Sequence, residues 1–392
     1  MKILVCTISF PYFDGNISDG RFVYSDVMAY AENDAEVIVL TPGFPGSPKI
    51  EKLEKNITVF RFSYFFPTSM QILRVPGKPI YDSRSFLALI QLPFLCIAFF
   101  LHILRLSRDV NIIHAQWTPT ALLALPAKWI FRKILVVTAR GSDIRLLPVW
   151  LNKFILKNVT ASIDCFGPTK WNLDNKNNFP SNYIRLPTLV YKDPITNHPA
   201  DIDNDCFTIL YVGRFHSIKI NQNHLPFFDL VNSGEALKKR KINFRIYYVG
   251  DGDPTLVKKL CKLIEDLELG DNIKLLGSKC NVIDYMSSCN LGIGGIAFNG
   301  VAQEYTICNT PQLFVDSEDN VDTPWRNKVN CLFVQPNDIQ DLTDKLLWAY
   351  DSAEAIQGFA DQASTDLGDY FMDSDKGGRI YLNEFEKLIK KY

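Results

Sequence analysis

Two stretches of the 392-residue chain carry side chains whose types and spacing could bind a charged ligand. The first runs from Tyr211 to Lys219 and reads Tyr-Val-Gly-Arg-Phe-His-Ser-Ile-Lys. Gly213 would let the backbone approach a ligand closely, and Arg214 and Lys219 would pair with diphosphate oxygens. The same residues also fit a solvated turn with two surface cations, and this stretch alone does not decide between the two interpretations.

The second stretch runs from Ile296 to Pro311, where a loop leads into a short predicted helix that begins near Val301. Glu304 lies in the first turns of that helix, where a carboxylate suits the helix dipole and could accept hydrogen bonds from sugar hydroxyls. Asn299 could add polar contacts through its amide. The alternatives are a favourable charge near a helix start for Glu304 and a tight-turn position for Asn299.

Three acidic clusters have metal-like spacing but are better explained as structure. They are Asp201-x-Asp203-x-Asp205, Asp251-Gly252-Asp253 and Asp373-Ser374-Asp375. The first has Cys206 where a calcium loop needs glycine, the second fits a strand-to-helix turn before Pro254, and the third caps the terminal helix. The nine cysteines show no metal-ligand spacing. We therefore predict no metal site and no cofactor.

Alternating short apolar runs and longer segments of helical period indicate parallel strands covered on both faces by helices. One series of predicted strands covers 2–9, 35–41, 57–62, 110–115, 133–139, 161–166 and 183–186, and a second covers 207–212, 244–249, 273–276, 289–293, 312–315 and 331–334. The polar stretch 191–205 between them is a predicted linker. Ligands of such sheets bind outside the carboxyl ends of the strands, in a crevice that two tandem sheets would share.

Charge and hydropathy suggest where the protein acts. The net charge is −1, which does not indicate a nucleic-acid binder. Residues 1–192 contain 22 basic and 13 acidic residues, whereas residues 193–392 contain 20 and 30. The single cysteines, and a first apolar run too short for a signal-peptide core, favour a reduced cytoplasmic setting.

Residues 86–106 are apolar almost throughout and leave three interpretations open: a buried crossover helix, an interfacial membrane segment, and a membrane span. Gln91, Pro93, His102 and Arg105 interrupt the run, and the strand pattern that follows would be cut in two by a span. With the basic first half, the run predicts peripheral contact with an anionic membrane.

The two ligand-binding stretches resemble motifs of the retaining, family-four glycosyltransferases of the GT-B fold. Gly213-Arg214 with Lys219 looks like that family's Gly-Arg-Leu…Lys element, whose cations contact the donor's phosphates and act in catalysis. Glu304, seven residues before Pro311, resembles the second half of its Glu-x7-Glu signature, where this glutamate holds the donor ribose. The resemblance implies that all four residues, with Asn299, face a nucleotide-diphosphate sugar.

Three further motifs extend the resemblance over the first half of the chain. Asp19-Gly20-Arg21-Phe22 falls where the family has a glycine loop beneath the donor phosphates. Ile113-His114-Ala115-Gln116-Trp117 resembles its His-Ala-His-Trp strand end, and Thr138-Ala139-Arg140-Gly141-Ser142-Asp143 its Thr-x-His-Gly-Ser-Asp turn. The resemblance implies that Gly20 binds the donor and that His114, Arg140 and Asp143 face the acceptor or the transferred sugar. Ile296 and Arg140 replace family residues, a glutamate and a histidine.

The implied architecture is α/β, with two Rossmann-like, doubly wound parallel-sheet domains facing a central cleft. An acceptor-binding domain spans 1–190, the linker 191–205, a nucleotide-sugar-binding domain 206–368, and a terminal helix at 369–392 crosses back to the first domain.

The implied reaction is metal-independent transfer of a hexosyl group with retention, from a UDP- or GDP-sugar to a saccharide or lipid-linked acceptor. Cell-surface polysaccharide or glycoconjugate biosynthesis at the inner face of the cytoplasmic membrane is the expected setting. Ile296 and Arg140 motivate an alternative, a nucleotide-binding or regulatory subunit that has lost turnover. A nucleotide-sugar epimerase is a second alternative, but it would need more acid and base side chains in the cleft than the sequence offers.

Overall fold

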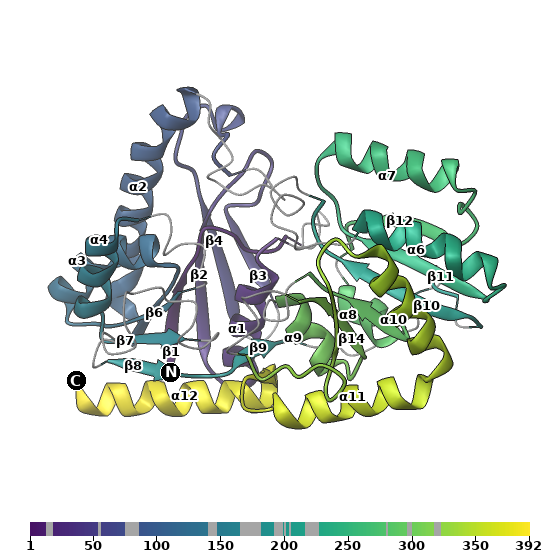
Figure 1. The fold of residues 1–392 in the computed structure, drawn as a ribbon. Helices are drawn as coiled ribbons and strands as arrows, with labels where there is room; N and C mark the ends of the chain where they lie inside the picture. The colour runs from purple at the N-terminus through teal and green to yellow at the C-terminus, as the bar shows by residue number, and fades with distance from the viewer. Residues whose placement is uncertain are drawn as a thin grey trace. The chain divides into compact units, whose positions relative to one another are not determined.

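The computed structural model describes residues 1–12, 19–53, 56–74, 86–139, 147–164, 182–191, 199, 201–203, 205–215, 227–279, 281–295, 300–316 and 323–392. The chain divides into two compact units, coloured along the sequence in Figure 1. The first comprises Met1–Tyr191 and Met372–Tyr392, and the second comprises Lys192–Phe371. The C-terminal segment therefore packs within the first unit, although it follows the second unit in sequence.

The described part of the first unit contains an eight-stranded sheet in the order β3-β4-β2-β1-β5-β6-β7-β8. The strands are β1 (Lys2–Cys6), β2 (Glu36–Pro42), β3 (Ile50–Leu53), β4 (Ile57–Phe62), β5 (Ile112–Gln116), β6 (Ile134–Ala139), β7 (Ala161–Asp164) and β8 (Tyr183–Arg185). All neighbours run parallel except β3, which pairs antiparallel with β4 at the edge. The strand order reverses between β1 and β5, which makes their carboxyl ends a topological switch point.

Helices cover both faces of this sheet. They are α1 (Arg21–Glu32), α2 (Phe86–Leu106), α3 (Thr118–Phe131), α4 (Val149–Asn158) and α12 (Ser374–Lys391), with short 3-10 turns η1 (Thr68–Met70) and η3 (Ser107–Asp109). The helices α2, α3 and α4 pack on one face of the sheet, and α1 and α12 pack on the other. In Figure 1, α2, α3 and α4 lie at the left and α12 runs along the bottom of this unit, where it packs against α1. Gly378 of α12 lies so near α1 that a Cβ on it would come within 2.4 Å of the Ala29 carbonyl oxygen. A two-stranded ribbon, β9 (Thr188–Val190) with β16 (Phe371–Asp373), precedes α12.

The second unit has a parallel sheet whose six described strands lie in the order β12-β11-β10-β13-β14-β15. The strands are β10 (Phe207–Val212), β11 (Phe244–Val249), β12 (Ile273–Gly277), β13 (Leu291–Ile293), β14 (Gln312–Val315) and β15 (Leu332–Val334). The helices are α6 (Phe227–Lys239), α7 (Pro254–Asp266), α8 (Val282–Ser287), α9 (Gly300–Ile307), α10 (Ile339–Asp351) and α11 (Ala353–Asp366). This is the strand order of a Rossmann sheet, with its switch point between β10 and β13.

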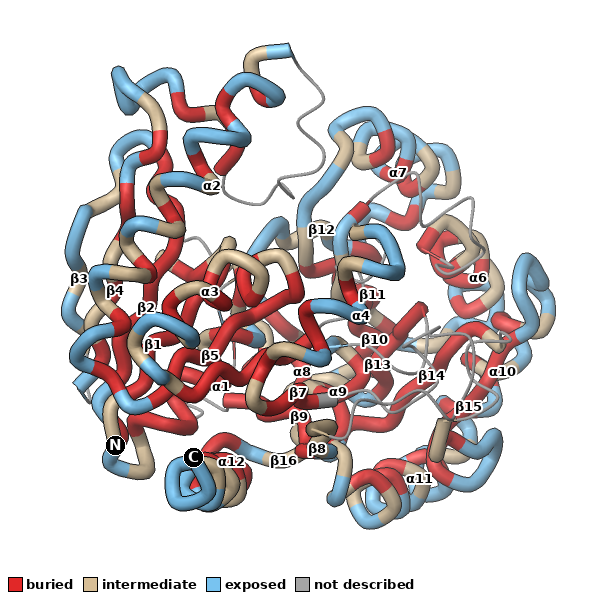
Figure 2. Tube along the Cα trace, turned by 90° about the vertical axis from the view of Figure 1, so that its left-hand side faces the viewer, coloured by how far each residue is buried: buried red, intermediate tan, exposed pale blue. Residues whose placement is uncertain are grey.

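Burial explains why the strands read as nearly continuous apolar runs. In Figure 2 the strands are red along most of their length, whereas the helices alternate between red and pale blue. Each of the thirteen predicted strands has a counterpart in the structure. Three short strands were not predicted: β3, β9 and β16. β3 is an edge strand on which Ile50 is exposed, so it lacks the apolar run of a buried strand.

Residues 86–106 form one helix, α2, which connects β4 to β5 as a crossover. On its buried face, the side chains of Leu95, Phe99 and Ile103 pack into the core of the unit. Gln91 is fully buried, accepting a hydrogen bond from Ile72 N at 3.1 Å and donating one to Met70 O at 2.8 Å. Among the described residues, α2 with η3 is the one helical segment long and apolar enough to cross a membrane by length and composition.

Candidate functional site

The predicted cationic turn lies at the carboxyl end of β10, on the switch point of the second sheet. β10 ends at Val212, and Gly213 and Arg214 follow directly. The turn is hydrogen-bonded to the end of β11, because Gly213 N donates to Val249 O at 3.0 Å and Phe215 N donates to Asp251 O at 3.1 Å. Its backbone is therefore held in place before any ligand binds.

Two glycines allow the turns after β10 and β11 to approach this closely. Gly250 has a φ of 141°, and a Cβ there would lie 1.9 Å from the Gly213 carbonyl oxygen. A Cβ on Gly252 would lie 2.1 Å from the Phe215 carbonyl oxygen. Asp253 then caps α7, accepting a hydrogen bond from Thr255 N at 2.8 Å. The Asp-Gly-Asp sequence is thus a strand-to-helix turn.

An aromatic cluster packs beneath the cationic turn. Tyr211, Phe215, Phe227 and Tyr248 are all fully or almost fully buried and in ring contact. The Tyr248 hydroxyl donates to Phe227 O at 2.7 Å, whereas the Tyr211 hydroxyl has no hydrogen-bond partner among the described residues. Burial raises the pKa of Tyr211. A Cβ on Gly213 would come 2.8 Å from the Tyr211 hydroxyl, so this ring packs directly against the turn.

The helix that carries Glu304 is fixed to the same strand. Glu304 is half-buried on α9, and the adjacent Tyr305 is fully buried. The Tyr305 hydroxyl donates to Leu210 O of β10 at 2.8 Å. Its ring lies over Gly292 of β13, where a Cβ would come 2.5 Å from a ring carbon. Tyr305 therefore anchors α9 to both strands of the switch point, β10 and β13. Its hydrogen-bond partner Leu210 precedes Gly213 by three residues.

The structure brings together only part of the predicted donor site. Arg214 is exposed on the turn after β10, and Glu304 lies on α9 beside the same strand. Lys219 and Asn299 lie outside the described residues, as does Ile296. Their roles remain predictions, as do those of Gly213, Arg214 and Glu304.

Gly20 forms a tight turn in the first unit. It precedes α1 with a φ of 80°, and a Cβ would come 2.6 Å from the Ser9 carbonyl oxygen. The preceding residue, Asp19, forms an ion pair of 2.6 Å with Arg74, and both side chains are nearly buried. Sequence reasoning missed Arg74, because no local spacing connects it to Asp19. The pair fixes the turn that the resemblance places beneath the donor phosphates.

His114, predicted to face the acceptor or the transferred sugar, lies in the core of the first unit. It is fully buried in β5, where Nδ1 lies 3.1 Å from the Tyr30 hydroxyl and Nε2 lies 2.8 Å from Thr138 Oγ1. Phe385 of α12 packs on its ring. These contacts tie α1, β5 and β6 together, and the role of His114 toward the acceptor or the sugar stays a prediction. Arg140 and Asp143, predicted for the same side, lie outside the described residues.

No group of three or more His, Cys, Asp or Glu side chains with metal-binding geometry occurs among the described residues. The first acidic cluster serves as structure: Asp201 accepts hydrogen bonds from the Tyr285 hydroxyl at 2.7 Å and from Lys279 Nζ at 2.9 Å. Asp373 caps α12 by accepting from Lys376 N at 3.0 Å.

Comparisons with known proteins agree with this geometry. Residues 206–352 match the family described as Glycosyl transferases group 1. A sucrose-phosphate synthase from Thermosynechococcus elongatus has a similar structure (TM-score 0.73, 15% identity, 100% of both chains covered). So does HepE from Anabaena, solved with UDP and glucose (TM-score 0.67, 13% identity, 99% of this chain and 100% of that chain covered).

The trehalose-6-phosphate synthase OtsA is also similar (TM-score 0.65, 13% identity, 98% of this chain and 99% of that chain covered). A search of curated protein sequences finds no match. At these identities the solved structures establish the fold, and the family match covers most of the second unit. The chain therefore has the GT-B fold of these structures, and its residues 206–352 match the glycosyltransferase group 1 family model.

Proposed function

We propose that the protein transfers a hexosyl group, with retention and without a metal ion, from a UDP-sugar to a saccharide or lipid-linked acceptor. The observation that carries the proposal is the cationic turn after β10, at the switch point of a sheet that matches the glycosyltransferase family. The structure of HepE with UDP-glucose supports UDP as the nucleotide. Cell-surface polysaccharide or glycoconjugate biosynthesis is the proposed setting.

The chemistry requires positive charge near the leaving group. Transfer with retention passes through an oxocarbenium-like state while the diphosphate departs with its negative charge. Arg214 and Lys219 would stabilise that charge through charge-assisted hydrogen bonds, so no metal ion is needed for this role. Gly213 would present its backbone to the diphosphate, and the hydrogen bonds of the turn to β11 keep it preorganised.

Calorimetric titration with UDP tests the donor site. Replacing Arg214 or Lys219 with alanine should each weaken binding by about 1.5–3 kcal/mol, the range expected for a hydrogen bond between charged groups. Arg240→Ala is the matched control, because Arg240 is an exposed cation at the end of α6 in the same unit. Equal UDP affinity in all three variants and the parent would refute the assignment of the donor site.

Turnover needs a separate measurement. The anomeric configuration of the product, read by NMR against that of the UDP-sugar, distinguishes retention from inversion. Activity that survives a chelator supports the metal-independent mechanism. Strong UDP binding without transfer to any acceptor in a saccharide and lipid-linked panel would favour the regulatory-subunit alternative, which no observation on the described residues supports at present.

A further inference from the structure

Helix α2 is apolar on both of its sides. Its buried stripe consists of Ala88, Gln91, Leu95, Phe99 and Ile103, at the spacing of one helical face. Away from the sheet, its large apolar side chains are exposed: Phe86, Leu89, Ile90, Leu92, Phe94, Ile97 and Leu101. A helix that only completed a soluble core would carry polar residues on its outer side. This outer side therefore needs an explanation of its own.

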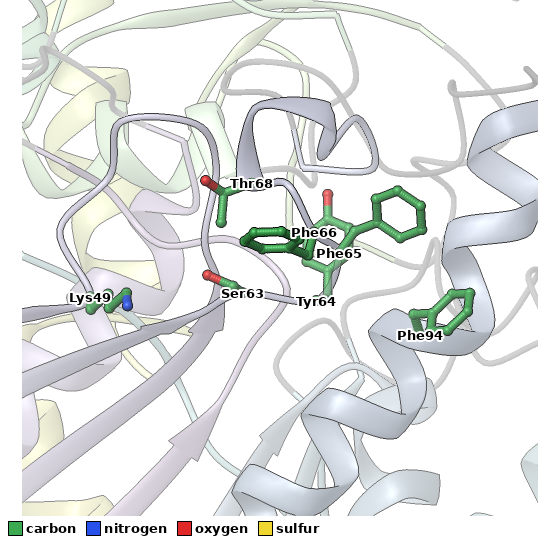
Figure 3. Close-up of a pocket in the computed structure, with 7 residues that line it drawn as sticks. All are labelled: Lys49, Ser63, Tyr64, Phe65, Phe66, Thr68 and Phe94. Carbon is green, nitrogen blue, oxygen red and sulfur yellow. The ribbon is translucent and has the colours of Figure 1, made fainter.

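The apolar surface continues onto the segment that follows β4. Phe65 packs edge-on against Phe94 of α2, with ring centroids 5.7 Å apart. Phe66 is 89% exposed beside them. Together these rings line an open pocket of about 600 Å³, at whose rim Lys49, Ser63 and Thr68 supply one cation and two hydroxyls (Figure 3). An apolar pocket with a cationic edge suits a molecule with a hydrocarbon tail and an anionic head.

The two neighbouring helices extend the same surface. α2 packs against α3 and α3 against α4, and all three cover one face of the sheet. Trp129 at the end of α3 and Trp150 at the start of α4 are 53% and 69% exposed. Ile130 and Phe154 beside them are also exposed. Tryptophan is enriched at the boundary between water and hydrocarbon, because its ring is apolar and its N–H is polar.

The charges on these helices are almost all positive. The segments 86–109, 118–133 and 149–158 contain basic residues at 105, 108, 128, 132, 133, 153 and 157, and one acidic residue, Asp109. Arg105, Arg132, Lys153 and Lys157 are exposed. Lys128 and Lys133 instead bind backbone carbonyls within the unit. The apolar surface is thus bordered by cations, which is complementary to an anionic lipid surface.

We propose that the outer side of α2, with the Phe66 segment and the exposed ends of α3 and α4, docks onto an anionic lipid bilayer. The helix lies in the plane of the membrane interface, with Ile97 and Leu101 among the apolar side chains that enter it. The buried stripe of α2 stays in the core of the first unit, so the helix does not span. The cytoplasmic leaflet supplies such a surface. This inference goes beyond the proposed function and does not depend on it.

Vesicle co-sedimentation of the full-length protein tests the inference. One vesicle preparation is phosphatidylcholine alone, and the other is three parts phosphatidylcholine to one part phosphatidylglycerol. The parent should sediment with the anionic vesicles at low salt, release largely at high salt, and bind neutral vesicles weakly. Replacing both Ile97 and Leu101 with glutamate should lower binding at least tenfold, because two apolar anchors become charges.

The matched control replaces Val329 and Ile339 with glutamate. Both are exposed apolar residues of the second unit, each 42% exposed. This control should bind as the parent does. In a separate arm, Lys153→Gln and Lys157→Gln should each weaken binding about fivefold, and only at low salt. Thermal melts show whether each variant is folded, and the lysine variants keep the test valid if the α2 variant does not fold.

Several results would overturn the inference. The parent could stay in the supernatant with anionic vesicles at low salt, or the α2 variant could bind as well as the parent. A parent dimer that the α2 variant dissociates, without vesicle binding by either, would show that the surface joins two copies. Resistance to alkaline carbonate would show a span. Donor affinity is measured apart from vesicles, so failure here leaves the proposed function intact.

Discussion

Gly250 lies against the carbonyl oxygen of Gly213, so close that a Cβ on Gly250 would come 1.9 Å from it. The contact joins the turn after β11 to the turn after β10, which carries Arg214. Gly250 also has a φ of 141°, a value that L-residues rarely adopt. The cationic turn of the candidate donor site thus depends on a glycine in the neighbouring turn.

Gly250→Ala should destabilise the protein and displace the cationic turn. Both the contact and the backbone angle must relax, and we expect a loss of about 2–4 kcal/mol in the free energy of unfolding. Urea unfolding measures this loss, and calorimetry should show weaker UDP binding in the folded fraction. Gly270→Ala is the control, because a Cβ there meets no atom within 4 Å. Equal stability of the two variants would contradict the packing described here.

Much of the fold could be predicted from the sequence because buried parallel strands are apolar on both faces. β1 and β10 sit in the middle of their sheets, and their apolar runs reflect that burial. The edge strand β3 escaped prediction for the opposite reason, since both of its faces carry a charged residue: Lys52 is exposed, and Glu51 forms an ion pair of 2.7 Å with the buried Arg61. The length of α2 was also predictable, but its position on the sheet depends on contacts such as that of Gln91 with the segment after β4.

The site was harder to predict because its contacts join distant parts of the chain. The hydroxyl of Tyr305 fixes α9 to Leu210, which is 95 positions away, and no local sequence pattern indicates that hydrogen bond. His114 shows the converse problem. The sequence around a histidine at a strand end does not distinguish a side chain that faces a ligand from one that faces the core. The contacts of His114 with Tyr30 and Thr138 show that it lies in the core.

The paired tyrosines of the aromatic cluster should respond differently to loss of their hydroxyls. Tyr248→Phe removes a buried hydrogen bond to Phe227 O and should cost about 1 kcal/mol of stability. Tyr211→Phe removes a buried hydroxyl with no partner among the described residues, and should be neutral or stabilising. Urea unfolding gives the free energy of unfolding of both variants. Because phenylalanine keeps the ring and its packing, the difference from the parent reports on the hydroxyl alone. A larger loss for Tyr211→Phe would reveal a partner for that hydroxyl.

Acid should destabilise the second unit through Asp366. Burial by itself raises the pKa of this carboxyl, but hydrogen bonds from Arg326, Gln362 and Asn330 outweigh it and lower the pKa below its ordinary value. A carboxyl with a lowered folded-state pKa stabilises the protein above the unfolded pKa of about 3.9, and this contribution is lost as the pH falls through the folded pKa. The urea midpoint should therefore drop below about pH 4.

Asp366→Asn tests that assignment. It should reduce stability at neutral pH and flatten the dependence of the urea midpoint on pH in the acid range. Asp361→Asn is the control on the same helix, where the carboxylate accepts hydrogen bonds from Asn309 and Gln357 without a charged partner among the bonds described. An unchanged acid slope in Asp366→Asn would assign the loss to other carboxyls, such as Asp201, whose pKa is also lowered.

Glu304→Gln should keep the fold and weaken donor binding. Glutamine has the size of glutamate but lacks its charge, so α9 should stay anchored through Tyr305 while hydrogen bonds to donor hydroxyls weaken. We expect UDP affinity to fall by about 1.5 kcal/mol, roughly tenfold, in calorimetric titration. Glu265→Gln, on the exposed side of α7, is the matched control and should bind UDP as the parent does.

A ligand change identifies which donor group Glu304 meets. The resemblance to the glycosyltransferases assigns this glutamate to the ribose, so the parent should bind UDP more tightly than 2′,3′-dideoxy-UDP. The Glu304→Gln variant should discriminate less between these ligands, because it lacks the carboxylate that would accept hydrogen bonds from the ribose hydroxyls. Equal discrimination in variant and parent would place Glu304 away from the ribose. Unchanged affinity for both ligands, with both proteins folded, would leave it as a charge near a helix start.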